Sequence, residues 1–220
     1  MWAGASEKLK SSRIGVLGGT FDPVHLSHLQ LAQHAIKEVG LKEILFIPAA
    51  QPPHKYRVTT PFLHRLGMVE AMCRNHDNFT CSDIENRLQK PSYTVDTLFA
   101  LKNELPTGTS LFFIIGMDAF LELMTWKSYR TVLTMAQMVV SPRLGYSPES
   151  FNNFLDHLGY KGKHRHWQGE GDTKDITLLS AAPKEICSRK IRKILAEGGD
   201  ASEFLSPEVA NYINENNLYN

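Results

Sequence analysis

The feature that most constrains the fold is a regular alternation of short apolar runs with stretches of helical spacing. A β-branched run over 13–17 ends in two glycines, and a helical pattern follows in Leu29, Ala32, Ile36 and Val39. Further apolar runs, at 44–47, 79–84, 111–115, 138–140 and 176–179, predict five more strands, with helical stretches between most of them. The run 111–115 is apolar throughout, which is typical of a strand covered on both faces. The order predicts an α/β fold: a doubly wound, Rossmann-like parallel sheet of about six strands, with helices on both faces.

The length of 220 residues fits one domain. We expect residues 1–12 to be a loose tail and 13–220 to form a single domain. A polar excursion at about 142–174 interrupts the alternation, and we predict a loop there with one helix near 149–158. Its histidines, His157, His164 and His166, lack the cysteine or carboxylate spacing of a zinc site, so we predict a solvated loop and no metal.

Composition excludes several classes of function. With 24 Lys and Arg against 23 Asp and Glu, the net charge of +1 lacks the positive field that bulk nucleic-acid binding requires. The apolar runs are too short to cross a bilayer, which needs about 20 residues. Three widely spaced cysteines without a CxxC pair favour a reduced setting. We therefore expect a cytoplasmic protein that binds neither nucleic acid nor membrane; its oligomeric state stays open.

The most informative stretch is GGTFDPVHLSH, residues 18–28, between the first strand and the first helix. Glycines there permit positive φ and close approach to phosphate oxygens, and the following helix offers unpaired N–H groups. Thr20 adds a donor, and His25 and His28 lie three apart, so both side chains can face one bound group. The stretch has neither GxGxxG nor GxxxxGK[ST] spacing, which argues against a dinucleotide oxidoreductase and a P-loop ATPase. The alternative is that both histidines only cap and pack.

These residues resemble the (T/H)xGH signature of the nucleotidyltransferase superfamily, and the longer form is most similar to bacterial nicotinate-nucleotide adenylyltransferases. Ser27 stands where that family has glycine. The resemblance implies an ATP site that includes Gly18, Gly19, Thr20, Phe21, His25 and His28. It also implies catalytic roles for His25, His28 and Arg192.

Two segments resemble the family's acceptor side. The loop PPHK at 52–55 implies that Lys55, and less directly His54, contacts the mononucleotide. The segment SYTVDTL at 92–98 implies that Tyr93 and Thr94 recognise the substrate, although the same residues also make a good helix start, with Thr94 as the cap.

Two more segments resemble the family's nucleotide side and stacking residue. GMD at 116–118 implies Gly116 and Asp118 in ATP binding, and Trp126 would stack on the pyridine ring, unless it is simply core. ICSRKIR at 186–192 implies phosphate contacts from Ser188, Arg189 and Arg192, with Cys187 and Arg189 departing from the family's hydroxyl residues.

The resemblance implies transfer of AMP from ATP to nicotinate mononucleotide, giving deamido-NAD and pyrophosphate in NAD biosynthesis, with Mg²⁺ accompanying ATP. The acceptor phosphate is already nucleophilic, so positioning and charge neutralisation are the work left to the protein. Two alternatives to this reaction stay open. One is that the chain is another nucleotidyltransferase, with nicotinamide mononucleotide or phosphopantetheine as acceptor. The other is that it is a nucleotide sensor without turnover.

Overall fold

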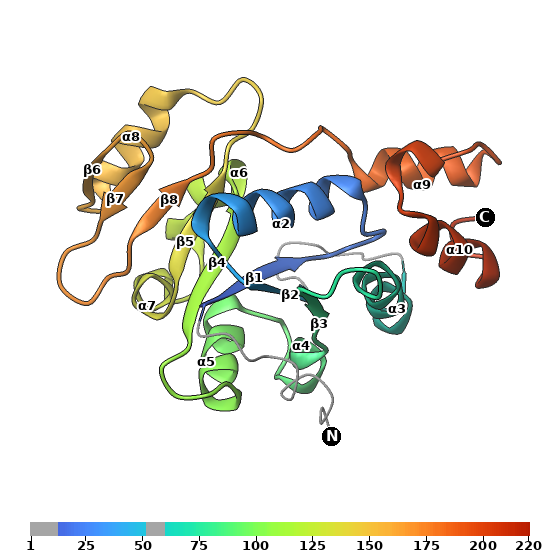
Figure 1. Ribbon diagram of the computed structural model, residues 1–220, viewed down its shortest axis with the longest axis horizontal. Coiled ribbons are helices and arrows are strands. Elements are labelled where there is room, and N and C mark those ends of the chain that lie inside the picture. The colour runs from blue at the N-terminus through green and yellow to red at the C-terminus, as the bar shows by residue number, and fades with distance from the viewer. Residues whose placement is uncertain (1–12, 52–59) are drawn as a thin grey trace.

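The computed structural model describes residues 13–51 and 60–220 (Figure 1). Its strands are β1 (Arg13–Gly19), β2 (Glu43–Pro48), β3 (Phe79–Cys81), β4 (Ser110–Gly116), β5 (Gln137–Ser141), β6 (Lys161–Lys163), β7 (His166–Gln168) and β8 (Ile176–Leu178). They form one sheet in the order β3-β2-β1-β4-β5-β8-β7-β6, and every pair from β3 to β8 is parallel. The predicted α/β fold is confirmed. The tail expected at 1–12 lies outside the described residues.

The sheet has eight strands in the described chain, so the prediction of about six is wrong. The two extra strands, β6 and β7, form an antiparallel hairpin inside the polar excursion and add to β8. Trp167 anchors this hairpin, because its ring is buried against Phe151 at 5.2 Å between centroids. The residues of β6 are all exposed, so the sequence carries no alternation that could mark a strand. The predicted helix within the excursion is confirmed as α8 (Pro148–His157).

Helices cover both faces of the sheet (Figure 1). One apolar cluster joins the sheet to α2 (Leu26–Val39), α3 (Phe62–Cys73), α9 (Ser188–Ala196) and α10 (Pro207–Glu215). The other joins it to α4 (Ile84–Arg87), α5 (Thr94–Glu104), α6 (Met117–Leu121), α7 (Tyr129–Met135) and α8. Along β4, Phe112 and Ile114 enter the first cluster and Phe113 and Ile115 the second. Both faces of this strand are therefore buried, as its apolar run predicts.

Two predicted boundaries differ from the structure. The strand expected at 79–84 ends at Cys81, and Ile84 already begins α4. The helical stretch predicted between the strands at 111–115 and 138–140 is three pieces: α6, the 3₁₀ turn η1 (Leu123–Thr125) and α7. The break follows from the extended backbone of Trp126 and the left-handed backbone of Ser128, with φ of 51°. It holds Trp126 at a corner between helices.

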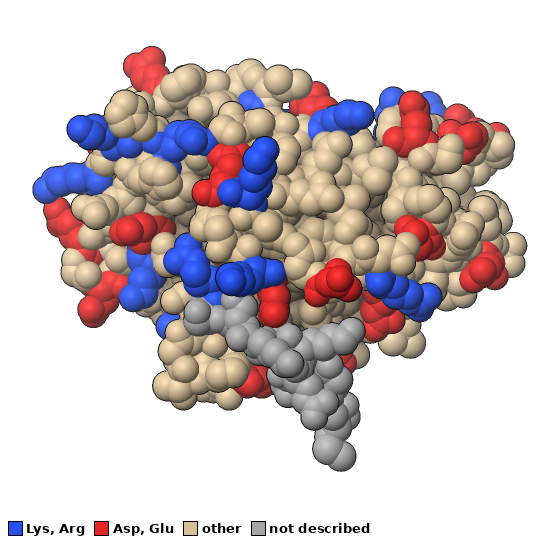
Figure 2. All heavy atoms as spheres, viewed as in Figure 1, with Lys and Arg blue, Asp and Glu red and all other residues tan. Residues whose placement is uncertain are grey.

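The surface matches the near-balance of charge. Positive and negative side chains are interspersed over the face shown in Figure 2.

A second 3₁₀ turn, η2 (Ser202–Phe204), leads into α10. In the described part of the chain, no helix is long and apolar enough to span a bilayer.

Candidate active site

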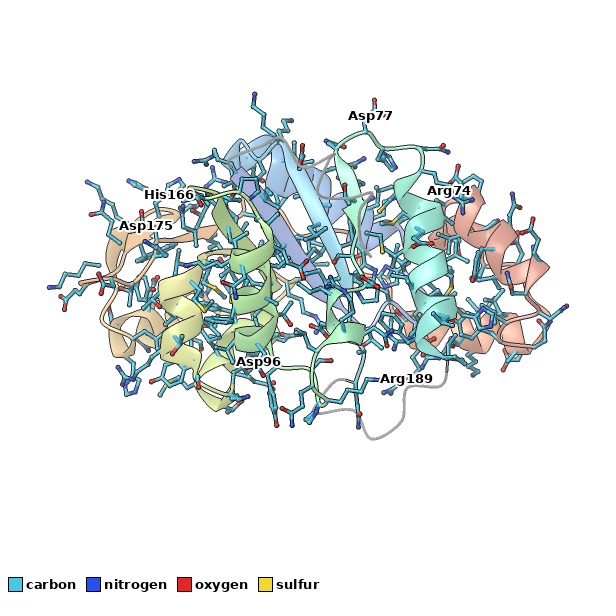
Figure 3. All side chains as sticks on the ribbon, turned by 90° about the horizontal axis from the view of Figure 1, so that it is seen from below. Arg74, Asp77, Asp96, His166, Asp175 and Arg189 are labelled. Carbon is cyan, nitrogen blue, oxygen red and sulfur yellow. The ribbon has the colours of Figure 1, made fainter. Side chains whose placement is uncertain are left out.

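The main pocket lies where the strand order reverses, at the carboxyl ends of β1 and β4. Its volume is about 440 Å³. In Figure 3, Asp96 of α5 and Arg189 of α9 lie toward the lower edge of the molecule, and Asp77 lies at the upper edge. The pocket is lined by Val16, Leu17, Gly18, Gly19, Thr20, His28, Leu31, Ile47, Ala49, Glu85, Ser92, Thr94, Thr97, Phe113, Ile114, Ile115, Gly116, Ala119 and Trp126.

The glycines of the first turn open the pocket rather than supply an unusual backbone. Positive φ falls on Phe21, at 50°, and on neither Gly18 nor Gly19, so that part of the prediction is wrong. A Cβ at Gly18 or at Gly116 would meet no atom within 4 Å, and both residues line the pocket. A side chain at either position would instead enter the space available to a ligand.

The two histidines have different places at the start of α2. Their rings stack with centroids 3.8 Å apart, and Nδ1 of His28 accepts a hydrogen bond of 3.2 Å from the backbone N–H of His25. In a neutral imidazole this leaves the proton on Nε2 of His28, and the side chain lines the pocket. His25 is 5% exposed and does not line it. Burial lowers the pKa of His25 to about 4, so this ring is neutral at pH 7.

The side chain of Phe21 also packs away from the pocket. It is buried and meets the ring of His28 edge to face at 5.0 Å. Phe21 therefore supports His28 from behind. Thr20 lines the pocket next to it.

Helix α9 holds the first turn from its outer side. Ser188 Oγ donates to the carbonyl of Pro23 at 3.1 Å, and Arg192 Nη1 donates to the carbonyl of Asp22 at 2.5 Å. The buried carboxylate of Asp22 also accepts a 2.8 Å hydrogen bond from the hydroxyl of Tyr219. Ser188 and Arg192 thus meet the predicted ATP turn, whereas Arg189 is exposed at the start of α9 (Figure 3).

The acceptor-side residues lie at the other end of the pocket. Thr94 and Trp126 line it, and a smaller pocket of about 230 Å³ beside it is lined by both and by Tyr93. Trp126 is half-buried and meets Phe113 edge to face at 6.1 Å, so one part of its indole packs and another is available. Tyr93, not Thr94, is the N-cap of α5. The ammonium of Lys127 lies 4.6 Å from the centre of the Tyr93 ring.

Asp118, predicted to bind ATP, does not line the main pocket. Its side chain is 64% exposed and forms an ion pair with Arg143. His54 and Lys55 lie outside the described residues.

Sequence reasoning missed two buried charged residues at the pocket: Glu85, which lines it, and Arg65, which holds the backbone around it. Arg65 of α3 donates to the carbonyls of Thr60, Thr20, Ala49 and Ala50 at 3.1, 2.8, 2.7 and 3.4 Å. Glu85 of α4 accepts from the backbone N–H of Ala50 at 3.2 Å and from the hydroxyl of Thr97 at 3.0 Å. The signal for Arg65 was a charge at helical spacing with Met68, Val69 and Met72. Glu85 carried no such signal.

Comparison with known proteins identifies the family of the chain. The family model described as Cytidylyltransferase-like matches residues 16–194. A probable nicotinate-nucleotide adenylyltransferase of Desulfotalea psychrophila is 40% identical over 212 residues, covering 94% of this chain and 99% of the relative. One of Aeromonas salmonicida is 37% identical, covering 94% of this chain and 96% of the relative.

Solved structures show the same fold. The Plasmodium falciparum nicotinic acid mononucleotide adenylyltransferase complexed with NaAD has a TM-score of 0.71 at 20% identity, covering 94% of this chain and 97% of that one. A putative nicotinate-nucleotide adenylyltransferase of Vibrio parahaemolyticus has a TM-score of 0.63 at 17% identity, covering 94% of each. The chain belongs to the cytidylyltransferase-like family and, within it, to the nicotinate-nucleotide adenylyltransferases.

Proposed function

We propose that the chain transfers the adenylyl group of ATP to nicotinate mononucleotide, giving deamido-NAD and pyrophosphate in NAD biosynthesis. The observation that carries the proposal is the pocket at the carboxyl ends of β1 and β4. It joins a glycine-rich helix start with His28 to an indole, Trp126, and the start of α5. A triphosphate suits the first end and a flat heteroaromatic ring the second. The relatives with that name support this assignment.

In the proposed reaction, a phosphate oxygen of the mononucleotide attacks the α-phosphorus of ATP. A P–O bond forms there, the bond to the bridging oxygen of the β-phosphate breaks, and pyrophosphate leaves with that electron pair. No general base is needed, because the attacking oxygen is already ionised at neutral pH. Catalysis then rests on in-line positioning and on hydrogen bonds to the phosphates.

On the nucleotide side we assign His28 Nε2 and Thr20 as donors to the phosphates. Gly18, Gly19 and Gly116 give the close approach. His25 supports His28, as does Phe21. On the outer side of the turn, Ser188, Arg189 and Arg192 would meet the triphosphate, and Asp118 would accept from the ribose hydroxyls after leaving Arg143.

On the acceptor side we assign Trp126 to stack on the pyridine ring, and Tyr93 and Thr94 to contact its carboxylate. Lys55 and His54 remain predicted contacts of the mononucleotide. All of these roles are proposals.

Mg²⁺ belongs to this proposal as part of the substrate Mg-ATP. Residues 13–51 and 60–220 contain no group of three or more His, Cys, Asp or Glu side chains that could hold a metal ion. The triphosphate oxygens therefore suit the ion better than any set of side chains seen here, since Mg²⁺ commonly binds through substrate phosphates.

The test is pyrophosphate release from Mg-ATP with nicotinate mononucleotide, nicotinamide mononucleotide and phosphopantetheine in parallel. We expect turnover with nicotinate mononucleotide and a loss on the order of 10²–10³ in rate in His28→Ala. Faster pyrophosphate release with one of the other two acceptors would show that the chain is a nucleotidyltransferase with a different substrate. ATP binding without release from any acceptor would favour a sensor.

A further inference from the structure

Glu85 is unusual for a site that binds phosphates. It is 9% exposed, and it is the only carboxylate among the described residues that line the main pocket. No Lys or Arg of the described chain lines that pocket. An anionic side chain here repels every phosphate group of both proposed substrates.

The local contacts hold the carboxylate in place without neutralising it. Its hydrogen bonds come from uncharged donors, the backbone N–H of Ala50 and the hydroxyls of Thr97 and Ser92. Arg65 is close enough to act on it electrostatically, but the guanidinium donates its hydrogen bonds to backbone carbonyls. Burial raises the pKa of Glu85 above its ordinary value. A buried carboxylate in this condition gains most from a cationic partner.

One part of the proposed substrates is cationic. The pyridine nitrogen of nicotinate mononucleotide is quaternary, because it is bonded to the ribose, and it carries a full positive charge. Trp126 lines the same pocket, and the face of an indole also attracts cations. Among the parts of the two substrates, only the acceptor's pyridinium ring can both stack on the indole and offer a positive charge to the buried carboxylate.

We propose that Glu85 is a specificity-determining residue that selects the positive charge of the acceptor's pyridinium ring. This inference rests on the proposed function and assigns it a second element of recognition, independent of the ring's carboxylate. The carboxylate attracts the ring nitrogen across the pocket, and Trp126 provides the stacking face. A neutral aromatic ring of the same shape would then bind poorly.

The test compares two acceptors that differ only in ring charge. One is nicotinate mononucleotide. The other is its C-nucleoside analogue, a 3-carboxyphenyl riboside 5′-phosphate, in which carbon replaces the ring nitrogen and the ring stays planar. We expect the wild-type protein to prefer the cationic ring at least tenfold in kcat/KM, and in Kd by calorimetry.

The decisive variant is Glu85→Gln, which removes the charge and keeps the shape. The amide oxygen can accept from Ala50, and the amide nitrogen can donate to Thr97, whose hydroxyl has a second acceptor at 3.2 Å in the carbonyl of Tyr93. We expect the preference between the two acceptors to fall toward unity. Glu85→Asp should keep most of the preference. Glu149→Gln, an exposed change of equal charge on α8, should keep all of it.

The outcomes separate the two proposals. Equal losses with both acceptors in Glu85→Gln would show a purely structural role and overturn the inference. If Glu85→Gln does not fold, the wild-type comparison decides, because equal binding of the two rings also overturns it. If the wild-type protein turns over neither acceptor, the proposed function fails, and calorimetry with the same pair still tests the selection of ring charge.

Discussion

Replacing Arg65 by methionine tests whether one buried guanidinium holds the walls of the pocket together. Arg65 is 1% exposed and joins the loop after β1, at Thr20, to the loop after β2, at Ala49 and Ala50. Methionine fills much of the same volume but donates no hydrogen bond. The buried backbone carbonyls that accept from Arg65 would lose their charged hydrogen-bond donor.

The expected cost follows from those contacts. A buried acceptor left without its donor costs about 1–3 kcal/mol. Three of the four carbonyls accept from Arg65 at 3.1 Å or less, so we take about 4 kcal/mol, toward the lower end of the summed cost. For a domain of this size each kcal/mol lowers Tm by about 2–4 °C, so we expect a fall of about 8–16 °C. Arg65→Lys should cost less, because the ammonium keeps the charge but lacks the planar fork.

The assay is thermal unfolding of the purified protein, followed by KM values for both substrates at a temperature where each variant is folded. The control is Arg74→Met, which changes an exposed arginine at the C-cap of the same helix. Equal Tm values for Arg65→Met and Arg74→Met would refute the reasoning.

The remaining predictions concern stability and reactivity. The unfolded protein takes up a proton at His25 near pH 6.5, whereas the folded protein does so only near pH 4. The free energy of unfolding should therefore fall by about 2 kcal/mol from pH 7 to pH 5. Urea titrations of His25→Gln at the two pH values should lack this fall. Iodoacetamide should modify Cys187 first, because it is exposed and backbone N–H groups of α9 lower its pKa, while burial raises the pKa of the other two thiols; faster labelling of either of those by mass spectrometry would contradict this. Tyr219→Phe removes the donor to the buried carboxylate of Asp22 and should cost about 1–3 kcal/mol in urea unfolding, whereas Tyr212→Phe, whose hydroxyl lies 3.4 Å from a histidine ring, should cost under about 0.5 kcal/mol. Equal costs would argue against the role of that contact.

The sequence predicts the local parts of this molecule better than the non-local ones. The turn between β1 and α2 is a contiguous stretch, so its glycines and histidines can be placed from their spacing alone. Which of the two histidines faces the pocket depends on how their rings pack against each other and against Phe21. The spacing of the residues in the sequence does not predict this packing. The hairpin β6–β7 depends on pairing with β8 and on one buried ring, Trp167, in an otherwise polar stretch.

The buried charges show the same limit. Arg65 and Glu85 are stable only because backbone groups from separate segments converge on them. A single sequence states the charge of such a residue but not its partners. Arg65 could have been suspected from its place on an apolar helix face, whereas Glu85 becomes visible only with the pocket.

The contact between Tyr219 and Asp22 joins residues 197 positions apart in the chain. Arg192 reaches the same turn across 170 positions. At about 5–20 residues per second, a ribosome adds Tyr219, which donates to Asp22, roughly 10–40 s after it adds Asp22 itself. A nascent chain makes β1 and α2 early, yet its proposed nucleotide-binding turn stays without Arg192 until translation has reached α9 and without Tyr219 until it has passed α10. The first functional segment to be synthesised is therefore among the last to be completed.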